Sequence, residues 1–70
     1  MAKTIWVNEQ IDPCGILQAC IACTSEAHAQ ACYASFEQDL SDEQREAGWT
    51  VRIRTVDSWE QVPVNALKLA

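Results

Sequence analysis

The chain has 70 residues, which is room for one domain, since a polypeptide of this length buries only about 60% of its unfolded surface. Its composition is 49% hydrophobic and 21% charged with two glycines and two prolines, which excludes collagen-like, low-complexity and disordered classes. Ten acidic residues against five basic ones give a formal net charge of -5, which argues against direct binding to nucleic acid or an anionic membrane and favours a basic partner.

The start of the sequence does not resemble an export signal. Met1, Ala2 and Lys3 lead into a strand-like run instead of an apolar signal core. No segment approaches the roughly 18 apolar residues that a membrane span needs. We therefore expect a cytoplasmic protein whose cysteines are reduced.

The first expected element is a short strand over residues 4–7, where β-branched and aromatic side chains follow one another. Residues 8–10 are expected to form a turn. Asp12 followed by Pro13 then predicts a helix start, because the carboxylate can cap the first amides. Proline fits the first helical position, where its missing N–H costs nothing.

A long helix is the strongest expectation in the sequence. Residues 16–40 contain no glycine or proline, and six alanines lie between Ala19 and Ala34. At about 100° per residue, the apolar side chains change faces near residue 27. One face holds Ile16, Cys20, Cys23, Ala27 and Ala31, and the opposite face holds Ala22, Ala29, Tyr33, Phe36 and Leu40.

Two interpretations account for this change of face. The helix can break near Thr24 and Ser25, with Ser25 capping a second helix, so that each half turns its own face to one core. Alternatively, it continues, and its two faces are covered by the chain's own sheet and by a second subunit. We favour the continuous helix, because good helix formers follow Ser25. The expected homodimer interface then consists of Ala22, Ala29, Tyr33 and Phe36.

A short second helix and a strand are expected next. Ser41 and Gln44 match a capping box, and Gly48 stands where a C-cap glycine ends a helix. Residues 49–56 alternate apolar and polar side chains, which predicts a strand with Arg52 and Arg54 on its polar face. These arginines either pair with acidic groups of a neighbouring strand or subunit, or keep the sheet surface soluble.

The remaining residues predict a turn and an edge strand. Residues 57–61 are expected to form a short turn or helix that Pro63 ends, and residues 64–69 a strand. The order strand, helix, short helix, strand, turn, strand predicts an α+β two-layer sandwich. In it, a small antiparallel sheet packs on one long helix, with a short second helix. Residues 1–70 are expected to form one domain.

Four cysteines are the candidates for metal or redox chemistry, namely Cys14, Cys20, Cys23 and Cys32. On a continuous helix, roughly 13 Å of rise separates Cys23 from Cys32, so they cannot share one zinc ion. Cys20 and Cys23 also lie inside the expected helix and not at its N-terminus, where a redox pair gains a lowered pKa. We expect cysteines that pack as small hydrophobes, without a cofactor. His28, the only histidine, lacks a partner for a catalytic dyad.

Acidic side chains are concentrated at the end of the long helix and in the short one. They are Glu37, Asp39, Asp42, Glu43 and Glu46, and Arg45 is the one basic residue among them. Such a cluster either steers association with a basic surface or serves capping and solubility. Three tryptophans in so short a chain favour binding, because an exposed tryptophan is a typical interface anchor. The candidates are Trp59 and Trp6, the latter out of phase with Ile5 and Val7.

Together these features predict a small acidic binding protein and not an enzyme. We expect an inhibitor or regulator that occupies a basic surface of a larger protein, for example a phage or mobile-element inhibitor of a host nucleic-acid-binding complex. A homodimer is expected, because a two-sided helix carries more apolar surface than one small sheet covers. The alternative is a zinc, iron–sulfur or thiol redox protein that uses Cys14, Cys20, Cys23 and Cys32.

Overall fold

The computed structural model describes residues 4–69, in which four strands, two α-helices and one 3-10 helix form a single layered unit. In chain order they are β1 (Ile5–Ile11), β2 (Leu17–Cys23), α1 (Glu26–Asp39), α2 (Asp42–Ala47), β3 (Thr50–Val56), η1 (Trp59–Gln61) and β4 (Leu67–Leu69). The α+β prediction, with a sheet on a long helix plus a short helix, is confirmed. Met1, Ala2 and Lys3, on which the export-signal argument drew, lie outside the described residues.

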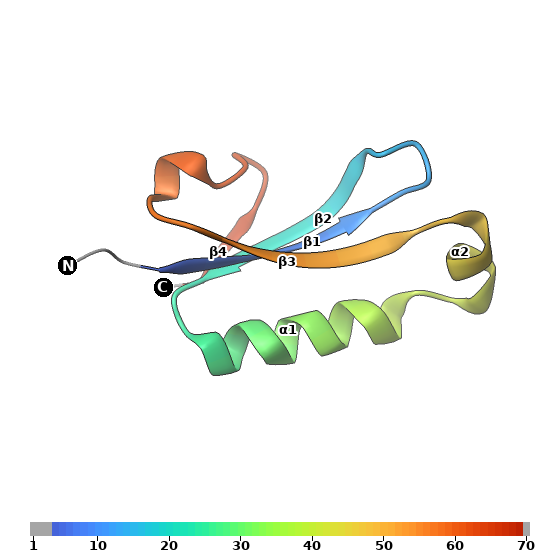
Figure 1. The fold of residues 1–70 in the computed structure, drawn as a ribbon, viewed down its shortest axis with the longest axis horizontal. Helices are drawn as coiled ribbons and strands as arrows, with labels where there is room; N and C mark the ends of the chain where they lie inside the picture. Colours follow the sequence, from blue (N-terminus) through green and yellow to red (C-terminus); the bar gives the residue numbers. More distant parts are fainter. Residues whose placement is uncertain (1–3, 70) are drawn as a thin grey trace.

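The strands form one sheet in the order β3-β1-β2-β4. β1 pairs antiparallel with β2 and with β3, whereas β4 pairs parallel with the end of β2. The expectation of a purely antiparallel sheet is therefore wrong at this edge. Figure 1 views the sheet from its β3 edge, with α1 below it and with η1 and the loop that leads to β4 above it.

A β-hairpin of β1 and β2 replaces the first half of the expected long helix. Residues 8–10, expected as a turn, lie inside β1, and Asp12 and Pro13 start the turn between β1 and β2. The amide of Gly15 donates to the carbonyl of Asp12 at 2.9 Å, and the amide of Asp12 donates to the carbonyl of Ile16 at 3.0 Å. Asp, Pro and Gly at the first, second and fourth positions favour a type I turn, and Gly15 supplies the positive φ of 84°. The predicted helix start at Asp12 is wrong for this reason.

The expected continuous helix over residues 16–40 is wrong in its first half, which is β2. The alternative break near Ser25 comes closer, because the Ser25 hydroxyl accepts from the His28 amide at 3.3 Å and begins α1. The segment before the break is a strand, however. Pairing with β1 turns Ala22 to one face of the sheet and Cys23 to the other, and both are buried. An apolar run buried on two faces has no alternation that would distinguish it from a helix.

Helix α1 covers one face of the sheet. Nδ2 of Asn8, in β1, donates to the carbonyl of Ala29 at 3.1 Å, and both residues are fully buried. Phe36 is buried in the same layer and Tyr33 is half-buried. Ala29 and Phe36 lie in this core, and Ala22 is buried on the opposite face of the sheet. The expected dimer interface is therefore wrong for these three residues. The two-sided helix on which it rested does not exist.

The opposite face of the sheet carries the second core. η1 and residues 62–66 pass over it, and partly buried Trp59 packs against its buried side chains. Those side chains are Ile5, Val7, Cys20, Ala22, Val56 and Val62. β2 is thus sandwiched between α1 and the segment that follows β3.

The second half of the chain follows the sequence prediction closely. The capping box at Ser41 and Gln44 is present, and Gly48 ends α2 with a φ of 106°. β3 and η1 lie where a strand and a short turn or helix were expected. Within residues 64–69 only Leu67–Leu69 form a strand.

Candidate functional site

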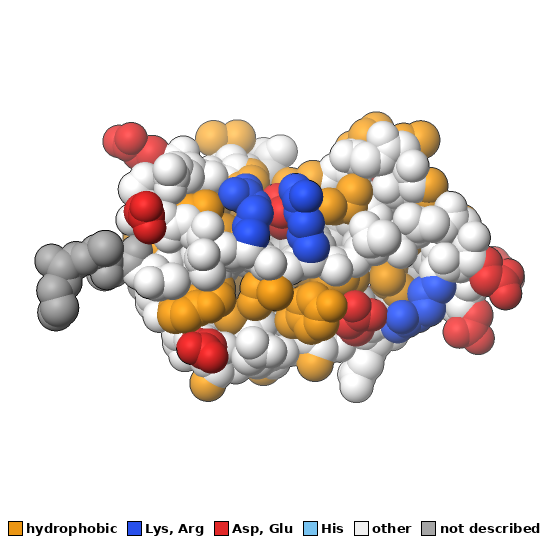
Figure 2. All heavy atoms as spheres, viewed as in Figure 1, with side chains coloured by type: hydrophobic (Ala, Val, Ile, Leu, Met, Phe, Trp, Pro, Cys, Tyr) orange, Lys and Arg blue, Asp and Glu red, His pale blue; other side chains and the backbone are white. Residues whose placement is uncertain are grey.

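The five predicted acidic residues lie together at one end of an elongated molecule, 42 Å along its longest axis. We call this region the acidic end, and its carboxylates belong to Glu37, Asp39, Asp42, Glu43 and Glu46. All are exposed except Glu37, which is half-buried. Figure 2 shows acidic side chains gathered at the α2 end of the molecule around one basic side chain. The structure therefore places this predicted set at the same end of the molecule.

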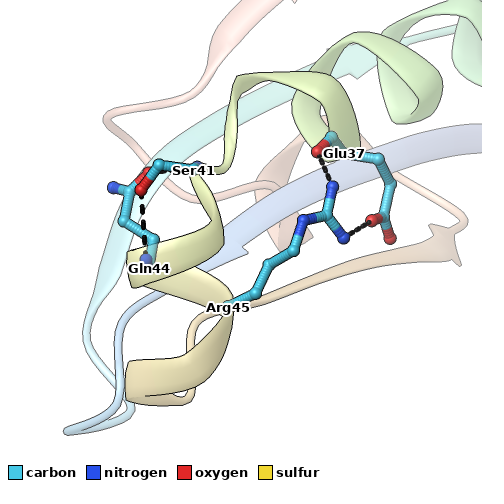
Figure 3. A network of polar contacts seen from close by, with 4 residues as sticks. All are labelled: Glu37, Ser41, Gln44 and Arg45. Atoms are coloured by element: carbon cyan, nitrogen blue, oxygen red, sulfur yellow. Dashed lines mark hydrogen bonds and ion pairs between the residues drawn. The ribbon is translucent and has the colours of Figure 1, made fainter.

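Hydrogen bonds within the chain occupy the one basic residue of the acidic end (Figure 3). Nη1 of Arg45 donates to a carboxylate oxygen of Glu37 at 3.2 Å, and Nη2 donates to the Glu37 carbonyl. The bond connects the last part of α1 to α2. Arg45 therefore compensates Glu37, and the other four carboxylates have no basic neighbour within the acidic end.

The cap of α2 fixes the position of those carboxylates. The Ser41 hydroxyl accepts from the Gln44 amide at 3.1 Å, and the Gln44 side chain accepts from the Ser41 amide at 2.9 Å. Asp42 and Glu43 stand in the first turn, where the helix dipole favours negative charge. These two carboxylates lie at the positive end of a well-capped helix. They therefore stabilise α2, in addition to any part they have in binding.

A second charged cluster lies on the sheet face opposite α1, and the sequence argument did not find all of it. The buried carboxylate of Glu9 accepts from Nε of Arg52 at 2.7 Å and from Nε of Arg54 at 3.1 Å, both on the same oxygen. Glu9 is 3% exposed, and the two arginine side chains are 61% and 39% exposed. Of the two alternatives left open for these arginines, the structure shows pairing with an acidic group of a neighbouring strand. Glu9 was missed because residues 8–10 were expected to be a turn.

The two arginines lower the pKa of the Glu9 carboxyl. Burial is the largest single influence on its pKa and raises it, but the hydrogen bonds and charges of Arg52 and Arg54 together outweigh burial. The pKa of Glu9 is therefore held below its ordinary value of 4.5. One carboxylate between two guanidinium groups leaves this cluster with a net positive charge in an otherwise acidic chain.

The tryptophans are all half-buried. Trp6 lies on the α1 face of the sheet, out of phase with Ile5 and Val7 as predicted, because its strand neighbours alternate between faces. Trp59 packs against the core cluster and so serves the fold. Their role in partner binding stays a prediction.

The structure does not bring the four cysteines together. Cys14 is exposed in the hairpin turn, and Cys20 and Cys23 point to opposite faces of the sheet. Burial raises the pKa of Cys20, and the Glu9 carboxylate adds to this effect. Burial also raises the pKa of Cys32, in α1, and Cys23 adds to this effect. The expected separation of Cys23 and Cys32 along one helix is therefore wrong, because the chain turns back between β2 and α1. Within residues 4–69 no group of three or more histidine, cysteine or acidic side chains could hold a metal ion.

A shallow groove of about 330 Å³ lies between the first half of β2 and the loop before β4. Its lining residues are Leu17, Gln18, Ala19, Cys20, Pro63, Val64 and Asn65. This groove was not predicted, because the two segments that line it are more than 40 residues apart in the chain. It holds no ionisable side chain other than the Cys20 thiol.

Comparisons of the chain with models of protein families, with curated proteins and with solved structures gave no match. In the part of the chain that the structure describes, neither helix has the length and apolar character needed to cross a membrane. The functional assignment therefore depends on the geometry of the two charged surfaces.

Proposed function

We propose that this chain is a small binding protein that acts without catalysis, as an inhibitor or regulator, by placing its acidic end on a basic surface of a larger protein. The observation that carries the proposal is the acidic end itself, where four exposed carboxylates on α2 and the end of α1 form no ion pair within residues 4–69. The fold supports it by holding α2 with a capping box and with the Arg45–Glu37 pair.

Charge at one end of an elongated molecule favours oriented encounter with a basic partner. A surface of one sign raises the association rate and penalises partners of the same sign. The basic residue within the acidic end is already bound to Glu37, so it offers no competing attraction for an acidic surface. Binding is therefore expected to weaken steeply as salt is added.

Thiol chemistry receives less support from the geometry. Cys20 and Cys32 have raised pKa values, so both thiols resist ionisation near neutral pH. The thiolate is the reactive form of cysteine. This favours packing roles for these two cysteines.

The experiment compares two matched triple variants in affinity purification from lysate of the native source. D39N/E43Q/E46Q neutralises the acidic end, and E26Q/D57N/E60Q neutralises three exposed carboxylates outside it. Both variants lower the negative charge equally and create no new charge in α2. A general effect of net charge would therefore change both to the same extent.

The proposal predicts that one protein recovered with the wild-type chain is lost from D39N/E43Q/E46Q and retained by E26Q/D57N/E60Q. Circular dichroism of each variant checks that the fold is intact. Equal recovery of partners by the two variants would contradict the proposal. The homodimer stays a separate prediction, which sedimentation of the purified chain tests.

A further inference from the structure

Strand β3 forms an open edge of the sheet. It pairs with β1 alone, and within residues 4–69 no loop forms a backbone hydrogen bond with its outer side. The edge extends over Thr50–Val56, whereas the opposite edge strand, β4, has only three residues. Figure 1 shows no other element in front of β3. An unpaired row of backbone N–H and C=O groups is a template for an added strand.

The two faces of this edge have different chemistry. Arg52 and Arg54 lie on the face away from α1, beside Glu9. Val51 and Ile53 alternate with them, are half-buried and lie on the α1 face. In Figure 2 two basic side chains lie above a row of hydrophobic side chains. An added strand would have to match both faces.

The two arginines retain hydrogen-bond donors for a partner. Each uses its Nε on one shared oxygen of Glu9, and the structure gives their Nη nitrogens no hydrogen bond within the described residues. One carboxylate balances only one of the two positive charges. Alternate residues of a strand are about 7 Å apart, so carboxylates at alternate positions of an added strand would each reach one guanidinium.

Pairing with a second copy of the chain is disfavoured at this edge in the register that pairs the full strand. When two β3 strands pair antiparallel around Ile53 with their helices on the same side, Arg52 of one copy lies opposite Arg54 of the other. Like charges directly opposite each other destabilise a sheet. The same two arginines therefore oppose self-pairing and favour an acidic partner.

We propose that β3 binds, by strand addition, an extended segment of another protein in which acidic and apolar residues alternate. The acidic residues would meet Arg52 and Arg54, and the apolar residues would extend the layer formed by Val51 and Ile53 beside α1. This second binding surface is separate from the acidic end and does not require it. A chain with both surfaces can bind one partner at two points of opposite charge.

The probe is a terminally blocked hexapeptide in which valine and glutamate alternate, titrated into the isotope-labelled full chain. Backbone amide shifts are expected to saturate at Thr50–Val56, and hydrogen exchange of these amides is expected to slow. A matched peptide with lysine in place of glutamate is expected to bind at least about tenfold more weakly. A glutamate peptide methylated on its backbone nitrogens is expected not to bind, because it cannot pair as a strand.

The variant E9Q/R52Q/R54Q removes all three charges together and leaves no buried charge unpaired. It is expected to lose the preference for glutamate over lysine. If this variant fails to fold, binding of the lysine and methylated peptides to the wild-type chain still tests the proposal. The proposal is overturned if the glutamate peptide does not bind, if the shifts lie outside β3, or if the lysine or methylated peptide binds equally well.

Discussion

Nδ2 of Asn8 in β1 donates a hydrogen bond to the carbonyl oxygen of Ala29 in α1, at 3.1 Å, in the middle of an apolar layer. The bond links the central strand of the sheet to the helix that covers it. Oδ1 of the same amide is buried and has no partner among the described residues. The Asn8 side chain therefore forms a hydrogen bond through Nδ2 and none through Oδ1. The stability of the protein should depend on which side chain replaces it.

The first prediction concerns Asn8→Asp. At neutral pH this change places an unpaired carboxylate against the Ala29 carbonyl, and we expect the free energy of unfolding to fall by about 3 kcal/mol. Because burial raises the pKa of such a carboxyl in the folded state, the loss should grow as pH rises above the unfolded value of about 3.9. Urea unfolding of the variant and wild type at about pH 3.5 and pH 7 measures it. An equal loss at both pH values would contradict the burial of residue 8.

The second prediction concerns Glu9→Gln. A carboxyl whose pKa is lowered by folding stabilises the protein above the ordinary value of 4.5, and this contribution is lost as pH falls below 4.5 and through the folded-state pKa. We expect wild type to exceed the variant by about 1–3 kcal/mol in unfolding free energy near pH 7. The difference should shrink toward acid pH. A difference that stays constant between about pH 7 and pH 3 would rule out the ionised triad.

The third prediction concerns the cysteines. Cys14 is exposed, whereas Cys20 and Cys23 are buried. Under native conditions near neutral pH, iodoacetamide should modify Cys14 at least about tenfold faster than Cys20. Peptide mass spectrometry over time gives the two rates, and the urea-unfolded chain provides the control in which all four thiols react. Modification of Cys20 as fast as Cys14 in the folded chain would favour a thiol redox protein.

The fourth prediction concerns the cap of α2. Ser41→Ala removes the hydroxyl that accepts from the Gln44 amide, and we expect a loss of about 1 kcal/mol in unfolding free energy. Ser35→Ala, an exposed position inside α1, is the matched control and should be neutral or slightly stabilising. Thermal unfolding of the two variants measures the difference. Equal stability would mean that α2 does not depend on its cap.

The sequence predicts well those features that depend on neighbours a few residues apart. The capping box at Ser41 and Gln44, the C-cap at Gly48 and the alternation in β3 are local, and all are present. The acidic end was predicted for the same reason, because its carboxylates lie close together in the chain. Local hydrogen bonds and side-chain periodicity fix these elements without help from distant residues.

The sequence fails where distant segments decide the structure. β2 lies between α1 and the loop that follows η1, so both its faces are apolar and its alternation is hidden. Asp12 and Pro13 favour a helix start and a type I turn equally well. Gly15, at the fourth position, was the signal that distinguishes the two.

The cluster of Glu9, Arg52 and Arg54 was also not predicted, because distant segments of the chain form it. The ladder partners Glu9 and Arg52 are 43 residues apart, and only the register of β1 with β3 brings them together. A carboxylate that continues the alternation of Ile5 and Val7 could have indicated a buried acid. Because the expected strand ended at Val7, Glu9 was assigned to a turn and its pairing with the arginines was not predicted.

The central claim, that the acidic end contacts the partner, is tested most directly by modifying carboxylates in the complex. The recovered complex and the free chain are treated with a water-soluble carbodiimide and an amine, and each carboxylate is followed by peptide mass spectrometry. We predict protection of Asp39, Asp42, Glu43 and Glu46 in the complex, with Glu26, Asp57 and Glu60 modified as in the free chain. Unchanged modification of the first group would contradict the account.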